Sequence, residues 1–200
     1  MKVYKFGGAS VRNADGVRNL AHIVDGESDL FIIVSAMGKT TNALERVFTH
    51  MQNGRKEEAN EEIKQVQDYH AAIIDDLWGE HTNINEVTLL FGQLRTIVND
   101  IVYRQSDAEL WYDTIVAYGE LISTTIISKY LNHIGMRNRW IDMRTTLLTN
   151  QRHKDANVDI KASKHRLRAS IENTGVGVFV GQGFIGGAPD GTTTTLGREG

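Results

Sequence analysis

Val3-Tyr4-Lys5-Phe6-Gly7-Gly8 opens the chain with a short apolar run that ends in two glycines, and Leu30-Phe31-Ile32-Ile33-Val34 forms a second apolar run. Short apolar runs without polar alternation are typical of strands that are covered on both faces, as in a parallel sheet. Between them, apolar residues recur at helical spacing, at Val17, Leu20, Ala21 and Val24, behind a possible helix cap at Asn13. A strand, a helix and a strand over about thirty residues predict a βαβ unit.

A long helical region follows the second predicted strand. Apolar residues recur every three or four positions over Leu44–Phe48, Ile63–Leu77, Val87–Ile101 and Leu110–Ile126. Thr41 or Asn42 is the expected cap of the first of these helices. Ser106 and Glu109 have the spacing of a capping box, which predicts the start of the last one. We expect these helices to form a large insert between the second and third strands.

The α/β pattern then resumes. Met136–Ile141 and Val176–Val180 are predicted strands, and apolar residues between Ile160 and Ile171 predict a helix that connects them. The last twenty residues differ, because glycines crowd together there with Pro189 and the run Thr192–Thr195. We expect a turn-rich loop rather than a packed element. The predicted fold is α/β around a mainly parallel sheet, and we expect a chain that ends in such a loop to be truncated.

Composition excludes several classes of protein. The 200 residues fit one domain, and a formal net charge of −3 gives no reason to expect a nucleic-acid or acidic-membrane partner. The sequence contains no cysteine, so thiol catalysis, disulfides and zinc-thiolate sites are excluded. Neither a signal peptide nor an apolar stretch of the roughly 20 residues that a membrane span needs is visible. These features favour a cytoplasmic protein.

Two glycine-containing turns could bind an anion. Lys5-Phe6-Gly7-Gly8-Ala9-Ser10 places a lysine, two glycine amides and a hydroxyl at the end of the first strand, which suits phosphate. A strand-to-helix turn that merely needs glycine explains the same residues about as well. Ser35 follows the second strand, where ligands of open α/β sheets bind, and Thr41 follows it closely. For Thr41, helix capping alone is the simpler interpretation.

Two later segments contain charged residues that could recognise a ligand. Glu120 lies among apolar residues of a predicted helix, where its charge needs either a structural ion pair or a ligand cation. The structural pair is the simpler interpretation. Gly183-Phe184-Ile185-Gly186-Gly187 and the segment from Thr192 to Arg198 combine glycines, hydroxyls and a guanidinium that could clamp a carboxylate or phosphate. A solvated loop is an equally good interpretation of this composition.

The seven histidines have no metal-binding spacing, so we expect no metal ligands among the residues of the chain. His70 lies on the apolar stripe of its helix and is expected to be packed. No nucleophile elbow is present, and the aromatic residues do not interleave with basic ones as a nucleic-acid platform requires.

The order of these four segments resembles that of the aspartokinases. Lys5–Ser10 is similar to the signature that opens those enzymes, and Tyr118-Gly119-Glu120 and Thr193–Arg198 are similar to later motifs. Ser35-Ala36 with Thr41-Asn42 is similar to their second segment. The resemblance runs over the whole chain and implies an amino-acid-kinase fold, an α/β/α sandwich. It implies ATP-dependent phosphorylation of the L-aspartate β-carboxylate, with Mg²⁺, as the first step of lysine, threonine and methionine biosynthesis.

The resemblance also implies a role for each matching residue. Lys5 would stabilise the transferring phosphoryl group, beside the backbone of Phe6, Gly7 and Gly8 and the hydroxyl of Ser10. A second group would bind the amino acid: Glu120 its ammonium, Arg198 its α-carboxylate, with Ser35, Thr41 and the backbone at Phe184 lining the pocket. No metal ligand is carried over.

Residues 1–200 would then form the N-terminal, aspartate-binding part of a catalytic domain. The resemblance implies a nucleotide-binding half and regulatory ACT domains beyond residue 200, so we expect the chain alone to be inactive or nearly so, and its parent to be a homo-oligomer. Ala9 stands where threonine is more usual, and Glu199 where many relatives have glycine. The alternatives are a related kinase that acts on N-acetylglutamate, glutamate or a nucleotide, and a binding module that has lost turnover.

Overall fold

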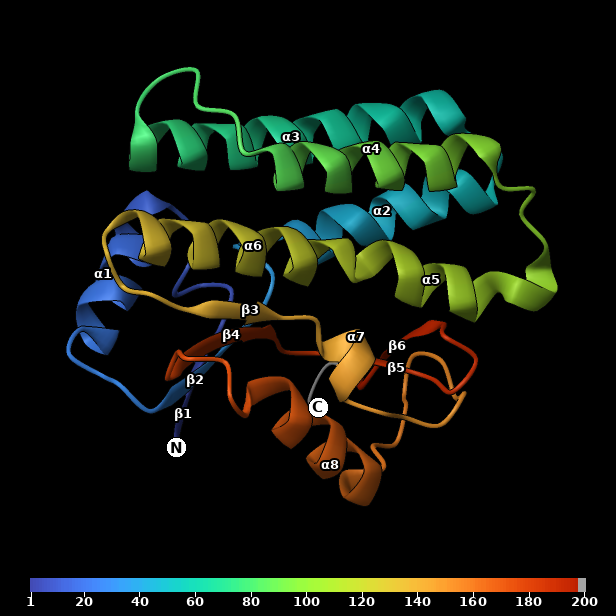
Figure 1. Cartoon of the computed structure of the whole chain (residues 1–200). Coiled ribbons are helices and arrows are strands. Elements are labelled where there is room, and N and C mark those ends of the chain that lie inside the picture. Colours follow the sequence, from blue (N-terminus) through green and yellow to red (C-terminus); the bar gives the residue numbers. More distant parts are fainter. Residues whose placement is uncertain (198–200) are drawn as a thin grey trace.

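A four-stranded parallel sheet forms the centre of the molecule (Figure 1). The computed structural model describes residues 1–197. In spatial order the strands are β1 (Lys2–Phe6), β2 (Leu30–Val34), β4 (Val178–Gln182) and β3 (Arg139–Ile141). β2 pairs with both β1 and β4, and every pairing in this sheet is parallel. The predicted α/β fold with a parallel sheet is therefore confirmed.

Helices cover both faces of the sheet (Figure 1). On one face, Ile32, Val34 and Val180 join the main core, to which α1 (Ala14–Val24) and α6 (Tyr118–His133) contribute. On the other face, Phe31 and Phe179 stack with ring centroids 6.1 Å apart and pack with α8 (Ile160–Ile171). The result is a three-layered α/β/α arrangement.

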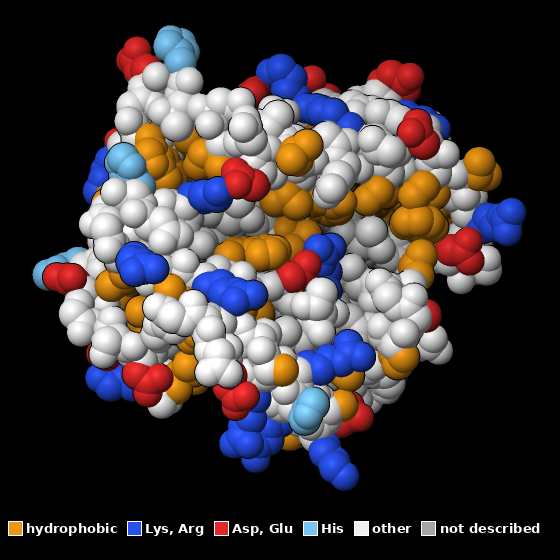
Figure 2. Space-filling model, viewed as in Figure 1, with side chains coloured by type: hydrophobic (Ala, Val, Ile, Leu, Met, Phe, Trp, Pro, Cys, Tyr) orange, Lys and Arg blue, Asp and Glu red, His pale blue; other side chains and the backbone are white. Residues whose placement is uncertain are grey.

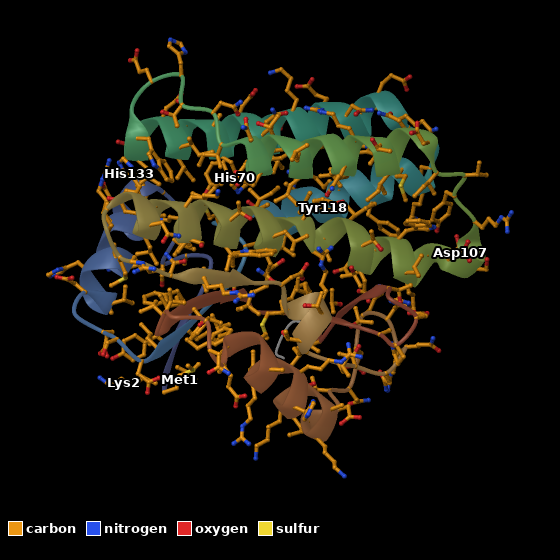
Figure 3. The ribbon with its side chains drawn as sticks, in the orientation of Figure 1. Met1, Lys2, His70, Asp107, Tyr118 and His133 are labelled. Atoms are coloured by element: carbon orange, nitrogen blue, oxygen red, sulfur yellow. The ribbon has the colours of Figure 1, made fainter. Side chains whose placement is uncertain are left out.

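The expected helical insert lies between β2 and β3. It consists of α2 (Thr40–Gln52), α3 (Lys56–Trp78), α4 (Asn85–Asp100), the 3₁₀ turn η1 (Gln105–Asp107), α5 (Ala108–Val116) and α6. In Figure 1, α3 and α4 lie side by side above α6. His70 is fully buried in this bundle, as predicted, close to Tyr69 and Phe91 (Figure 3).

Asn13 caps α1 as predicted, because its side chain accepts from the Gly16 amide at 3.0 Å. Two predictions about helix caps in the insert are wrong. α2 begins at Thr40, so neither Thr41 nor Asn42 is its cap. α5 lacks a side-chain cap, because Ser106 donates instead to the Asp107 carboxylate at 2.8 Å.

The predicted helix over Leu110–Ile126 is two helices that meet at Ala117. Ala117 itself has helical backbone angles, with φ at −59° and ψ at −23°, and just after it Gly119 packs against Ala36. A Cβ on Gly119 would come within 2.8 Å of the Ala36 side chain. Figure 3 shows Tyr118 at this junction. Almost every residue of α6 is buried, as expected for a helix between a sheet and other helices.

The C-terminal segment is packed as far as the structure describes it, up to residue 197, which corrects the prediction of a turn-rich loop. β5 (Ile185–Gly187) and β6 (Thr193–Thr195) form an antiparallel pair, and all three β5 residues are buried. The glycines of β5 lie against the backbone around α7 (Met143–Thr146), where a Cβ on Gly187 would overlap the Arg144 carbonyl oxygen. Glycine here provides close packing rather than turns.

The surface seen in Figure 2 carries a band of apolar side chains between α4 and α6. This band borders a hollow of about 350 Å³ that includes Leu89, Leu90 and Trp140. No helix within residues 1–197 is long and apolar enough to cross a membrane.

Candidate functional site at the carboxyl edge of the sheet

The predicted segments after β1, β2 and β4 meet at the carboxyl edge of the sheet, and Glu120 of the remaining segment reaches it through the Ala36 amide. The chain leaves β1 at Gly7, β2 at Ser35 and β4 at Gly183, and backbone hydrogen bonds join these exits. Ser35 N–H donates to the Phe6 carbonyl at 3.1 Å, and Gly183 N–H donates to the Val34 carbonyl at 2.9 Å. Parallel strands place their carboxyl ends at one edge, which is where open α/β sheets bind ligands.

The first turn presents unused donors. Gly8 packs so closely on the next loop that a Cβ would overlap the Ala36 carbonyl oxygen, and its own carbonyl accepts from Gly38 at 2.9 Å. Within residues 1–197, the amides of Gly7 and Gly8 donate to no protein acceptor. The side chain of Lys5 is exposed on β1, the edge strand, and forms no ion pair with a described residue. Free amides and a free ammonium suit an anion.

Glu120 is the most unusual group at this edge. Its side chain lies in the first turn of α6 and is 2% exposed. Oε1 accepts from the Ala36 amide at 3.0 Å, whereas Oε2 is buried and has no partner among the described residues. Burial raises the pKa of Glu120 from 4.5 to about 8, although the Ala36 amide acts in the opposite direction. The structural ion pair that sequence reasoning favoured is absent from the described part of the chain.

Ser35 lies between Glu120's helix and the exit of β4. Its carbonyl accepts from the Ser123 hydroxyl at 2.9 Å, which fixes the turn to α6. A Cβ on Gly183 would lie 3.7 Å from the Ser35 hydroxyl oxygen, so the serine side chain and this glycine are neighbours. The half-buried Ser35 therefore belongs to the same edge as Glu120.

Phe184 adopts a backbone conformation that non-glycine residues rarely take. Its φ is 65°, in the left-handed region, and its carbonyl accepts from the Leu196 amide at 2.9 Å. Such conformations cost free energy and persist where the surrounding structure enforces them, often at ligand sites. The strained residue directly follows Gly183, so it lies beside the Ser35 turn.

The remaining predicted residues are less central. Ser10 is exposed, and its amide donates to the Gly7 carbonyl at 2.9 Å. Thr41 is half-buried in the first turn of α2, and Phe6 is buried at the end of β1. Arg198 lies outside the described residues.

Sequence reasoning missed a polar network that supports α6. Thr124 donates to the Glu120 carbonyl at 2.7 Å and accepts from Gln182 at 2.8 Å and from Trp140 at 2.9 Å. Gln182, at the end of β4, also accepts from the Met143 amide at 2.8 Å. The network ties the backbone of Glu120 to two strands. A glutamine at the end of an apolar strand was the available hint.

Asp113 was also missed. This residue of α5 is fully buried, and burial raises its pKa above the usual range while hydrogen bonds from Thr195, Lys154 and His153 oppose that shift. Like Glu120, Asp113 is an acidic residue inside an apolar helical stretch. The argument that a charge among apolar residues needs a partner would therefore have singled it out as well.

The described residues contain no group of three or more histidine, aspartate or glutamate side chains that could hold a metal ion. The free donors at Lys5, Gly7 and Gly8 fit the phosphates of a nucleotide better than a metal, because each is a hydrogen-bond donor or cation.

Comparison with known proteins agrees with this geometry. The model of the amino acid kinase family matches residues 1–200. The chain belongs to the amino acid kinase family. It is 30% identical to lysine-sensitive aspartokinase 3 of Escherichia coli (strain K12), over 99% of this chain and 43% of that protein. It is 26% identical to bifunctional aspartokinase/homoserine dehydrogenase 2 of Arabidopsis thaliana, over 99% of this chain and 22% of that protein.

Solved structures of family members superpose well. Aspartokinase III of E. coli in complex with aspartate and ADP matches with a TM-score of 0.84 at 28% identity, over 99% of this chain and 44% of that one. The complex of the same enzyme with lysine and aspartate matches with a TM-score of 0.86 at 27% identity. The chain thus spans less than half the length of these relatives, and its similarity to aspartokinases covers their N-terminal catalytic part.

Proposed function

We propose that this chain binds L-aspartate at the carboxyl edge of the sheet. It would form the acceptor side of an aspartate kinase that makes 4-phospho-L-aspartate from ATP. The observation that carries the proposal is the buried Glu120 carboxylate, of which one oxygen has no partner within residues 1–197. A relative with 28% identity binds aspartate and ADP, which supports this choice of ligand.

An ammonium group is the ligand group that fits the buried carboxylate of Glu120. A buried carboxylate with an unpaired oxygen is costly, and a cation that donates hydrogen bonds removes this cost. In the proposed complex, the α-ammonium of the amino acid would donate to Oε2 beside the Ser35 turn. N-acetylated amino acids and nucleotide acceptors lack this ammonium, so Glu120 disfavours the sister activities on those substrates.

The other predicted residues would complete the site. Ser35, Thr41 and the backbone at Phe184 would line the acceptor pocket, and Arg198 would bind the α-carboxylate as a bidentate partner. Lys5, Gly7 and Gly8 would bind the phosphoryl group in transfer, with Ser10 and the Phe6 backbone beside them. Bound MgATP would supply the phosphoryl group, and the substrate β-carboxylate would be the nucleophile. Phosphoryl transfer of this kind depends on positioning and charge neutralisation.

Calorimetric titration of the chain with L-aspartate tests the proposal. Binding is the appropriate readout because the chain spans under half of the relatives that it matches. L-glutamate, N-acetylglutamate and UMP serve as competing ligands. We expect L-aspartate to bind, and Glu120→Gln to weaken binding at least about tenfold, since it removes a charge-assisted contact.

Glu172→Gln is the matched control, because Glu172 is exposed just after α8, away from the carboxyl edge. It should bind L-aspartate as the parent does. Binding of N-acetylglutamate or UMP in preference to L-aspartate would transfer the chain to a sister activity. No binding of any of the four ligands would reject the proposed acceptor site in this chain.

A further inference from the structure

Asp113 joins three segments of the chain with its side chain. Oδ1 accepts from the Thr195 hydroxyl at 2.6 Å, and Oδ2 accepts from the Thr195 amide at 3.1 Å. Oδ2 also accepts from the Lys154 amide at 2.9 Å and from His153 Nδ1 at 3.0 Å. The carboxylate of α5 therefore holds both β6 and the segment at 153–154.

The two buried carboxylates near the α5–α6 junction differ in one respect. Both oxygens of Asp113 are occupied by donors of the protein, whereas Oε2 of Glu120 has no described partner. A carboxylate that is saturated by four donors has no capacity left for a substrate or for a proton in transfer. Asp113 therefore acts on the protein, and Glu120 remains free to act on a ligand.

The contacts of Asp113 continue to the site. β6 pairs with β5, and directly after β6 the Leu196 amide donates to the carbonyl of Phe184. Phe184 is held in its left-handed conformation beside Gly183, which is bonded to the end of β2. A second tie supports β6, because the Ala156 amide donates to the Thr195 carbonyl at 2.9 Å. The hairpin is thus one unit, anchored to the helical insert through Asp113.

We propose that Asp113 is a positioning residue, which fixes the β5–β6 hairpin relative to Glu120 and thereby sets the affinity for L-aspartate. This role rests on the proposed function. The geometry supports it because α5 and α6 are consecutive: α6 brings Glu120 to the Ala36 amide, and α5 brings Asp113 to Thr195. α5 and α6 meet at Ala117, so the two carboxylates lie on directly consecutive helices.

Asp113→Asn is the first test. The substitution keeps the size of the side chain, but it replaces one acceptor oxygen by an NH2 group, which cannot accept a hydrogen bond and would face donors at Thr195 or Lys154. In the chain without ligand, we expect the amides of Thr195 and Lys154 to exchange hydrogen at least about tenfold faster, while the Ala36 amide is unchanged. In titrations, we expect the Kd for L-aspartate to rise by about tenfold or more.

Two further variants sharpen the test. Thr195→Val removes the hydroxyl donor to Asp113 and keeps the backbone amide, so it should also raise the Kd for L-aspartate. The double variant should have a Kd no higher than that of Asp113→Asn alone. If Asp113→Asn does not fold, Thr195→Val alone provides the test. Asp75→Asn is the matched control, because Asp75 accepts a backbone amide from Thr82 near the end of α3. It should leave both readouts unchanged.

The outcomes separate this role from simple stabilisation. Unchanged exchange at Thr195 and Lys154 would overturn the anchoring by Asp113. Faster exchange with an unchanged Kd would overturn its role in binding, because the hairpin position would then not matter for the ligand. If the unsubstituted chain binds no L-aspartate, the proposed function itself is overturned. The hydrogen-exchange data would still show whether Asp113 holds the hairpin.

Discussion

Glu120 shows how a single residue can oppose stability in favour of binding. Burial raises its pKa from 4.5 to about 8, so the folded chain holds a proton there that the unfolded chain releases near pH 4.5. Stability from this group is fully present below pH 4.5 and is lost as pH rises towards and through 8. Each unit of pKa difference corresponds to about 1.4 kcal/mol, so the loss is of the order of several kcal/mol.

Glu120→Gln should therefore stabilise the chain at pH 8 and have little effect at pH 5. Glutamine resembles the protonated acid and can still accept from the Ala36 amide. We expect the gain in the free energy of unfolding to be several kcal/mol at pH 8, measured by urea unfolding at both pH values. An equal effect at pH 5 and pH 8 would contradict the assigned ionisation.

The free energy of unfolding of Glu120→Gln is compared with that of the unsubstituted chain, because the pKa of His70 is shifted in the opposite direction to that of Glu120. Burial lowers its pKa from 6.5 to about 4, with the Val66 carbonyl acting against that shift. Stability from neutral His70 is present above pH 6.5 and is lost as pH falls through 4. Since His70 is common to both chains, its contribution cancels in the difference.

At the scale of elements, the sequence predicts a strand well where burial alone decides its extent. β2 has the predicted bounds, because five consecutive apolar residues are needed to contact helices on both faces. β4 begins two residues later than predicted, since Gly177 lies against the Ser28 carbonyl and accepts from Leu30 before the strand starts. A close backbone approach of this kind is invisible in a pattern of apolar residues.

The β5–β6 hairpin was missed for a related reason. Glycine is both the residue of turns and the residue of close packing, and its local sequence does not distinguish the two uses. Gly186 and Gly187 lack left-handed φ values and instead lie against the carbonyls of Leu147 and Arg144. The partners that give them this role are about forty residues away in the sequence, so only the fold shows it.

Substitutions at two glycines would separate these uses. Gly187→Ala should destabilise the chain by about 3 kcal/mol or more, because a Cβ would overlap the Arg144 carbonyl oxygen and force the backbones apart. Gly92→Ala is the control: it lies in α4 with open space around its Cβ position and should stabilise by up to about 1 kcal/mol. Urea unfolding measures both. A Gly187→Ala chain as stable as the parent would show that the segment is not packed as described.

At the scale of the whole molecule, the site is assembled from segments that are far apart in the sequence. The topology accounts for the part that could be predicted: parallel strands bring Gly7, Ser35 and Gly183 to one edge. The apolar neighbours of Glu120 drew attention to it but favoured a structural ion pair, and its unpaired oxygen became visible only in the structure. The role of Asp113 could not be predicted, because its partners lie 40 to 82 residues further along the chain.

Binding of L-aspartate at this assembled site should release a proton from Glu120 to the solvent. Without ligand at pH 7, Glu120 is mainly protonated, because burial places its pKa at about 8. An arriving ammonium favours the carboxylate, so binding should release close to one proton per ligand and should tighten as pH rises from 6 to 8. Calorimetry in two buffers with different ionisation enthalpies measures the release directly. Equal heats of binding in both buffers, together with a Kd that does not change with pH, would refute this coupling. The control variant Glu172→Gln should release the same proton as the unsubstituted chain, since Glu120 is the ionising group.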